Sequence, residues 1–339
     1  MNMKKIFLTV LAITALILTS CKNTVDIYSN SGDSTIVYAM LDPGLDTNYF
    51  KITKSFVGNA NQYAQNYDAN NYGYDEIDVK LIGKFENMAG TQTLTLDTIS
   101  KFLPYDTTSI FYNGCRQTYY YTAKRLKDGE SYRLEIFRKA DSVTISTEVT
   151  TLSKFYYKTQ KMQGIHPNFN MLKDNGLIAW YYTNKVSKAT YFDISIYFSY
   201  IENPGAFQTK QTIVWNVGSG AAENLYNSNE DIYNIRFKPS SFFSILENDE
   251  HLKNTQASSR RIIDTIKIKV SGIGEDLYNY YLVNNSPSAI QDVPNYSNIE
   301  NGVGLVSARS SSLLPSKISK ESLDKIVDDF PQYNFYYLP

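Results

Sequence analysis

The sequence predicts a mainly β protein, with an immunoglobulin-like or fibronectin-like β-sandwich followed by a larger β-rich domain with a few short helices. Three observations support this fold class. Runs rich in β-branched and aromatic residues recur along the chain, and several alternate between apolar and polar residues. Turn-forming residues separate the early runs at intervals of about 8–12 residues, which is typical of a sandwich. The chain has 339 residues, and at roughly 150 residues per domain we expect two folded units.

The composition excludes several function classes. Hydrophobic residues make up 42% and charged residues 20%, and 33 Lys+Arg balance 34 Asp+Glu to a net charge of -1. A disordered acidic tail or a dedicated nucleic-acid binder would not have this balance. The chain holds 29 Tyr but only 2 His, 2 Cys and 2 Trp, so side chains that usually perform chemistry at neutral pH are scarce. We therefore expect no enzyme and no cofactor.

The first residues are typical of an export signal. Two lysines precede an apolar run over residues 6–18, which is shorter than the roughly 20 residues that span a bilayer as a helix. The Leu-Thr-Ser-Cys segment that ends at Cys21 resembles the lipobox of bacterial lipoproteins, in which cleavage precedes a cysteine that is then acylated, for example with palmitate. We expect a signal peptide at 1–20 and a lipidated tether at 21–33. An ordinary cleaved signal with a chance cysteine is the alternative.

Residues 34–153 form the predicted sandwich. Two β-rich runs, 35–41 and 49–56, flank an Asp-Pro-Gly turn signal and predict a hairpin. Tyr132 follows a Lys-Asp-Gly turn and begins a Tyr-x-Leu-x-Ile strand, which resembles the corner tyrosine of immunoglobulin-like domains. Further strands are expected at 77–85, 91–96, 118–124, 132–138 and 143–149.

Residues 154–339 form the predicted β-rich C-terminal domain. Expected strands lie at 177–183, 189–201, 209–217, 232–237, 261–270 and near the C-terminus. Helices are expected at 239–246, 274–283 and 319–327. In the first of these, Ser240 or Ser241 could serve as the N-cap.

A family resemblance rests on the segment 294–309, whose Asn-Ile-Glu-Asn-Gly-Val-Gly core resembles the closing motif of a Bacteroidota-type family of outer-membrane lipoproteins of unknown function. The lipobox, a Val-Tyr-x-x-Leu-Asp opening at 37–42, the Tyr132 strand and the 274–283 helix follow in the order of that family. The resemblance implies an outer-membrane location beside a TonB-dependent transporter, and it supplies no catalytic residues. In the closing motif, Gly302 and Gly304 fit a tight turn or bulge that requires positive φ.

Candidate chemical sites are few. His166 and His251 lack the neighbours of a zinc site and are expected at the surface, so no metal site is predicted from them. Cys115 lies in an aromatic segment and is expected to be a small buried residue rather than a nucleophile. The segment that begins at Asp68 partly matches a calcium loop but has Tyr72 at the fifth position, so a polar loop is the preferred interpretation and a noncanonical ion site the alternative.

Tyrosines in the long loop over 58–74 are the preferred ligand contacts, because rigid amphipathic rings in a loop are harder to explain as core than tyrosines in strands. The alternative for the strand tyrosines is that they lie between core and solvent as β-propensity alone would place them. A glycan or a peptide would suit such rings. The candidates are Tyr63, Tyr67, Tyr72 and Tyr74.

These observations predict a lipid-anchored cell-envelope binding protein that is accessory to outer-membrane nutrient uptake. It would be attached to the outer membrane through lipid on Cys21, at the cell surface or the periplasmic face, and would have no nucleic-acid partner. A structural or adhesive surface lipoprotein is the alternative. An envelope hydrolase is a further alternative, although the sequence has no Gly-x-Ser-x-Gly elbow and no P-loop.

Overall fold

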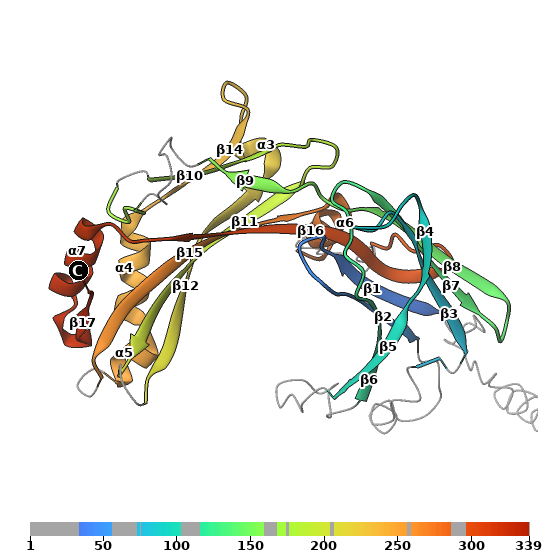
Figure 1. Ribbon diagram of the computed structural model, residues 1–339, viewed down its shortest axis with the longest axis horizontal. Helices are drawn as coiled ribbons and strands as arrows, with labels where there is room; N and C mark the ends of the chain where they lie inside the picture. Colours follow the sequence, from blue (N-terminus) through green and yellow to red (C-terminus); the bar gives the residue numbers. More distant parts are fainter. Residues whose placement is uncertain are drawn as a thin grey trace, which may run out of the picture.

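The computed structural model describes residues 34–55, 73–74, 76–102, 116–158, 168–173, 176–203, 207–255, 259–285 and 296–338. Strands dominate these residues and five short helices accompany them, so the expectation of a mainly β protein is confirmed. None of the described helices is long and apolar enough to cross a bilayer. The strands form three sheets arranged as an arch (Figure 1).

The largest sheet has nine strands and runs through the whole arch. Its neighbours are antiparallel except for two parallel pairs, β1 with β16 and β15 with β17. In spatial order the strands are β12 (Thr209–Ala221), β11 (Tyr191–Glu202), β15 (Arg261–Ile273), β16 (Gly302–Ser316), β1 (Thr35–Leu41), β2 (Asn48–Lys54), β6 (Arg116–Thr122) and β5 (Asp97–Phe102), with β17 (Phe335–Tyr336) beside β15.

Two four-stranded sheets pack on the same face of the large sheet. Successive side chains of a strand point to opposite faces, so the apolar side chains gather on one face, which the two small sheets cover. One completes the N-terminal sandwich and the other covers the C-terminal part. The first consists of β4 (Gln92–Thr95), β3 (Ile77–Gly83), β7 (Ser131–Arg138) and β8 (Val143–Thr150). The second consists of β13 (Tyr226–Asn227), β14 (Ile232–Phe237), β10 (Gly176–Tyr182) and β9 (Phe155–Tyr157).

Strand β16 joins the two halves of the molecule. Its first part pairs in parallel with β1, and its second part pairs with β15 of the C-terminal half. Gly304 makes the first pairing possible, since its φ is +124° and a Cβ there would lie 2.0 Å from the carbonyl oxygen of Val37. The positive φ expected at Gly304 is confirmed, although this glycine lies inside a strand rather than in a turn. The same expectation for Gly302 was wrong, because Gly302 lacks positive φ; there the close approach of the Thr35 carbonyl, 2.8 Å from where a Cβ would lie, accounts for the glycine.

The sandwich contains the expected tyrosine corner. Tyr132 is fully buried, and its hydroxyl accepts a hydrogen bond from the backbone N–H of Lys127 at 2.8 Å. The same hydroxyl donates to the carbonyl oxygen of Lys84. The side chain therefore fastens the turn before β7 to the end of β3, as in immunoglobulin-like sandwiches.

Aromatic side chains fill the core of the C-terminal half. The ring of Trp215 lies 5.5 Å from Phe237 and 5.4 Å from Phe242, which also contacts Phe198 at 5.3 Å. These contacts bring helix α4 and strand β14 onto the large sheet. The helices are α3 (Ala222–Leu225), α4 (Pro239–Asn248), α5 (Glu250–Asn254), α6 (Glu275–Asn285) and α7 (Lys320–Asp329).

Helices α7 and α4 begin in different ways. The Ser319 side chain caps α7 by accepting from the Ser322 N–H. In α4 the N-cap is Lys238, and Ser241 instead accepts a hydrogen bond from the Trp215 indole at 2.9 Å. The expectation of a serine cap at this helix was wrong, because Pro239 occupies its first turn and Ser241 serves the core.

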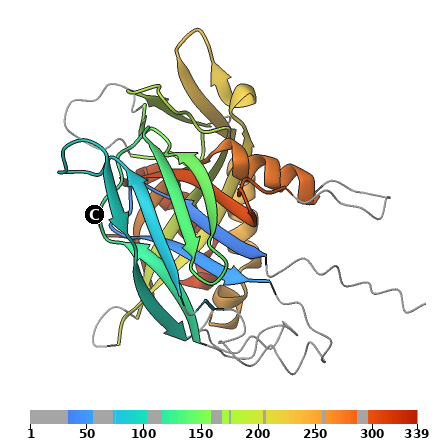
Figure 2. The same ribbon diagram turned by 90° about the vertical axis from the view of Figure 1, so that its right-hand side faces the viewer.

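The opposite face of the large sheet, called here the open face, lines the inside of the arch (Figure 1). Among the described helices, α6 lies on it against β16, and its Tyr278 stacks on Tyr191 of β11 at 5.2 Å. Figure 2 shows this orange helix protruding at one side of the molecule, away from the two small sheets. Exposed residues of the open face include Tyr38, Tyr49, Val214, Val303 and Leu313.

Candidate functional site

A cleft between the second small sheet and the large sheet is the best candidate site. Its volume is about 410 Å³, which lies within the usual range for small-molecule sites. Six separate parts of the chain line it. They are the end of β9 with Lys158, the segment 168–173, the first half of β10, the β13–β14 turn with the ends of β14, β15 at Ile268, and β16 at Leu314 and Ser316.

The cleft exists because β9 is much shorter than its neighbour. β9 has three residues and pairs only with Trp180–Tyr182 of β10, and the Lys158 N–H then bonds to the carbonyl of Ala179. Beyond this point the first half of β10 lies beside the cleft. The segment 168–173 forms the far wall, held in place by the Phe169 N–H bonded to the carbonyl of Lys317 at 2.7 Å.

The floor of the cleft is apolar. Ile178 and Phe237 approach from the small sheet, while Ile268 and Leu314 approach from the large sheet. Strand alternation explains the second pair, since Leu314 points to the covered side and its neighbour Leu313 to the open face, where it is 51% exposed. A ligand in this cleft would meet aliphatic and aromatic carbon along its body.

Tyr157 forms one end of the cleft and is structural. Its hydroxyl lies 2.7 Å from the carbonyl oxygen of Ile268 and 2.8 Å from that of Ser312, and it accepts from the Val270 N–H at 3.0 Å. Burial raises the pKa of this phenol far above its ordinary value, so it stays protonated in solution. The side chain fastens β9 to the large sheet and offers no free donor for chemistry.

The rim carries charges. Lys158 pairs with Glu230, and Lys185 pairs with Asp231 beside the same turn. Hydrogen bonds from Lys185 and from Tyr226 hold the pKa of the Asp231 carboxyl below its usual range. Lys173 lines the opposite wall, is exposed, and forms no ion pair with any residue in the described ranges. The described residues of the rim therefore carry one cation in excess.

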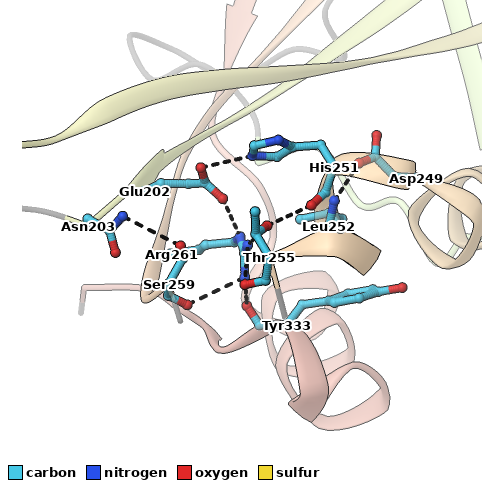
Figure 3. A network of polar contacts seen from close by, with 9 residues as sticks. All are labelled: Glu202, Asn203, Asp249, His251, Leu252, Thr255, Ser259, Arg261 and Tyr333. Atoms are coloured by element: carbon cyan, nitrogen blue, oxygen red, sulfur yellow. Dashed lines mark hydrogen bonds and ion pairs between the residues drawn. The ribbon is translucent and has the colours of Figure 1, made fainter. Parts of the chain in front are cut away.

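A second polar cluster lies at the far end of the C-terminal half (Figure 3). The guanidinium of Arg261 is completely buried and donates from Nε to Oε1 of Glu202 at 2.8 Å. The other oxygen of this buried carboxylate lies 2.9 Å from Nε2 of His251. Arg261 also donates from Nη1 to the carbonyl oxygen of Tyr333 at 2.6 Å and from Nη2 to that of Thr255 at 3.2 Å.

This cluster is a fastening rather than a reaction centre. Apart from the carbonyl of Ser259 just before β15, the groups to which Arg261 donates are a carboxylate, carbonyls and a hydroxyl from other elements. The side chain thereby joins β11, β15, α5 and the C-terminal turn (Figure 3). Such a buried charge needs its partners to offset desolvation. His251 lies in helix α5 at the edge of the cluster, and its side chain is 44% exposed, so the expected surface position is confirmed.

The structure places one of the four predicted contact tyrosines. Tyr74 is half-buried, and its hydroxyl forms a 2.8 Å hydrogen bond with Oγ1 of Thr35, so its polar end is used within the sandwich. Tyr63, Tyr67 and Tyr72 lie outside the described residues. The same is true of Cys21, Cys115, His166 and Asp68. No group of three or more His, Cys, Asp or Glu side chains gathers within the described part of the chain.

Sequence reasoning missed the cleft because its walls come from distant segments. The one local signal is the pair Tyr156-Tyr157, in which the first ring is 47% exposed while the second points into the protein. Because the edge strand β9 ends at the inward-pointing Tyr157, the first half of β10 has no strand beside it, and the cleft lies there. The position of Lys173 on the facing wall has no comparable local signal.

Comparison with known proteins gives a family and no function. No curated protein matches the sequence. A family model described as a domain of unknown function, DUF4249, matches residues 22–312. That span includes β1 and most of β16, and with them both halves of the large sheet and both small sheets. The resemblance to a family of unknown function is thereby confirmed at this level, and the chain belongs to the DUF4249 family.

Proposed function

We propose that this protein is a lipid-anchored binding protein of the bacterial cell envelope, accessory to nutrient uptake across the outer membrane. The observation that supports a binding role is the cleft, which has an apolar floor and a charged rim. The Leu-Thr-Ser-Cys segment at Cys21 supports the anchor. The resemblance to Bacteroidota-type lipoproteins supports the outer-membrane location and a TonB-dependent transporter as partner. The proposal includes no catalytic step.

Metabolic labelling tests the anchor. Cells that express the full chain are grown with an alkyne analogue of palmitate, and membranes are separated by density. We expect label on the protein in the outer-membrane fraction, and none on a Cys21→Ala variant. An unlabelled wild-type protein in the soluble fraction would contradict the proposal.

Affinity purification from detergent-solubilised outer membrane tests the transporter. Recovery of a large TonB-dependent transporter with the wild-type chain, and its loss with Cys21→Ala, would support the accessory role. Recovery of further copies of the chain alone would contradict that role.

A structural or adhesive role is the second candidate, and β12 favours it. This strand has 13 residues and ends the large sheet, so no described strand pairs with its outer edge. Long unpaired edges can add a strand from another chain. The terminal strand β17, in contrast, pairs with β15 of its own chain. Higher oligomers that dissociate when Val214→Lys is introduced on β12 would favour this second role.

A further inference from the structure

We infer that the cleft between β10 and β16 takes a small amphiphile that has an apolar body and one anionic group. This inference rests on the proposed binding function and names its ligand class. It depends on the position of the apolar floor and on the distribution of charge at the rim.

The apolar body follows from the floor. Ile178, Ile268 and Leu314 meet there with Phe169 and Phe237, whose rings pack 5.1 Å apart. Burying each methylene against such a surface contributes about 0.8 kcal/mol. The one hydroxyl at the inner end, that of Tyr157, is already hydrogen-bonded to the large sheet. Of the other polar side chains in the lining, Asn170 is already bonded to Glu321 and to the Leu172 N–H, and Ser316 to the carbonyl of Lys317, which leaves Asn168. A sugar would therefore find few partners for its hydroxyls, so the cleft disfavours ligands that are polar throughout.

The anionic group follows from the rim. Glu230 is neutralised by Lys158, which leaves the ammonium group of Lys173 as the charge in excess among the described residues of the wall. The second ion pair beside the mouth, Lys185 with Asp231, is likewise neutral as a unit. A carboxylate or similar head could lie between Lys173 and Lys158 while the body of the ligand enters the apolar floor. A cationic head would meet Lys173, and no carboxylate that the structure describes in the lining is free to offset it.

Isothermal titration of the chain that follows Cys21, which retains every described residue, tests the ligand class. The probes are octanoate, decanoate and dodecanoate, each below its critical micelle concentration, with decan-1-ol and decyltrimethylammonium as head-group controls. We expect binding to tighten about fourfold per added methylene until the cleft is full. We also expect decanoate to bind more tightly than decan-1-ol, and decyltrimethylammonium to bind most weakly.

Two matched variants locate the site. Leu314→Trp fills the cleft, so we expect at least a tenfold loss of decanoate affinity. Leu313→Trp, one position away on the open face, should leave the affinity within a factor of two. Unchanged binding to Leu314→Trp, with binding lost in Leu313→Trp, would overturn the assignment of the site.

Lys173→Gln tests the head group at an exposed position where folding is not at risk. We expect decanoate to bind three- to tenfold more weakly and decan-1-ol to be unaffected. Equal binding of all three head groups would overturn the anionic class but leave a binding cleft. Failure of every amphiphile to bind would overturn the inference, whereas the proposed envelope function would fail separately, in the palmitate-labelling experiment.

Discussion

The two faces of the nine-stranded sheet differ in what covers them. The covered face carries both small sheets and helices α4 and α5, whereas α6 lies on the open face. On β15 consecutive side chains point to opposite faces, so Ile266 and Ile268 are buried on the covered face while Lys267 between them is exposed on the open face. The alternation of inward and outward side chains continues through β16 and β1, so the covered face forms one wall of the core in both halves of the molecule.

The largest expected effect concerns two ion pairs. Arg261→Ala should lower the free energy of unfolding by about 3–5 kcal/mol, because it leaves the buried Glu202 carboxylate without its partner. Lys210→Ala removes a solvent-exposed pair with Asp264 and should cost at most about 1 kcal/mol. Urea unfolding of both variants measures the difference. Equal losses of stability would contradict the expectation that the buried ion pair matters more than the exposed one.

Neighbouring positions on β15 give the next effect. Ile266→Ala creates a cavity on the covered face and should cost about 2–5 kcal/mol, whereas Lys267→Ala on the open face should stay within about 0.5 kcal/mol. Thermal unfolding of the pair is the measurement. A large loss in Lys267→Ala would mean that the open face is packed against something in solution.

The pH dependence of stability compares the buried Tyr132 of β7 with Tyr49 on the open face. Burial raises the pKa of Tyr132 to about 12 from an ordinary value near 10. Because the folded state holds the proton more tightly, this tyrosine's contribution is fully present below pH 10 and is lost as the pH rises toward 12. Tyr132→Phe should cost about 1–2 kcal/mol at pH 7 through the lost corner hydrogen bonds.

The same variant should also weaken the fall in stability between pH 10 and 12, which urea unfolding at a series of pH values measures. Tyr49→Phe on the open face serves as the control, since that ring is 39% exposed. A pH profile that Tyr132→Phe leaves as steep as in the wild type would refute this assignment.

The smallest expected effect compares the two tryptophans, which are both fully buried. The indole N–H of Trp215 donates to Ser241, while that of Trp180 has no hydrogen-bond partner among the described residues. Replacement by Phe removes similar volume from each site. Trp215→Phe should therefore cost about 1 kcal/mol more than Trp180→Phe. Calorimetry can resolve this difference, and the reverse order would indicate a partner for Trp180.

Local patterns predicted most single elements of this fold and few of their partnerships. The hairpin of β1 and β2, the Tyr132 corner and helices α4, α6 and α7 follow from alternation, turn residues and capping signals. Strand β5 was missed because it begins directly after β4, with only Leu96 between them, where the chain changes sheets. β9 is too short, at three residues, to show a period.

The pairing of β1 with β16 could not be predicted, since it joins Thr35 to Gly302 and no local preference specifies a partner so far along the chain. For the same reason the candidate site could not be predicted from the sequence. Leu314 and Lys173 belong to one cleft only because two sheets pack together. Tyr74 was predicted as a ligand contact because it lies in a long loop, and its hydroxyl is hydrogen-bonded to Thr35 of the sandwich.

The position of β1 has a mechanical consequence. The chain enters the fold through this strand, which lies between β16 and β2 rather than at an edge. A pull on its N-terminal end acts along the strand, across the ladder that runs from Thr35 to Leu41 beside β16 and the ladder beside β2. Both ladders then bear the load in shear, where their hydrogen bonds resist together instead of opening one by one. With the anchor proposed at Cys21, the chain would thus be held through a strand that resists being pulled out of the sheet one hydrogen bond at a time.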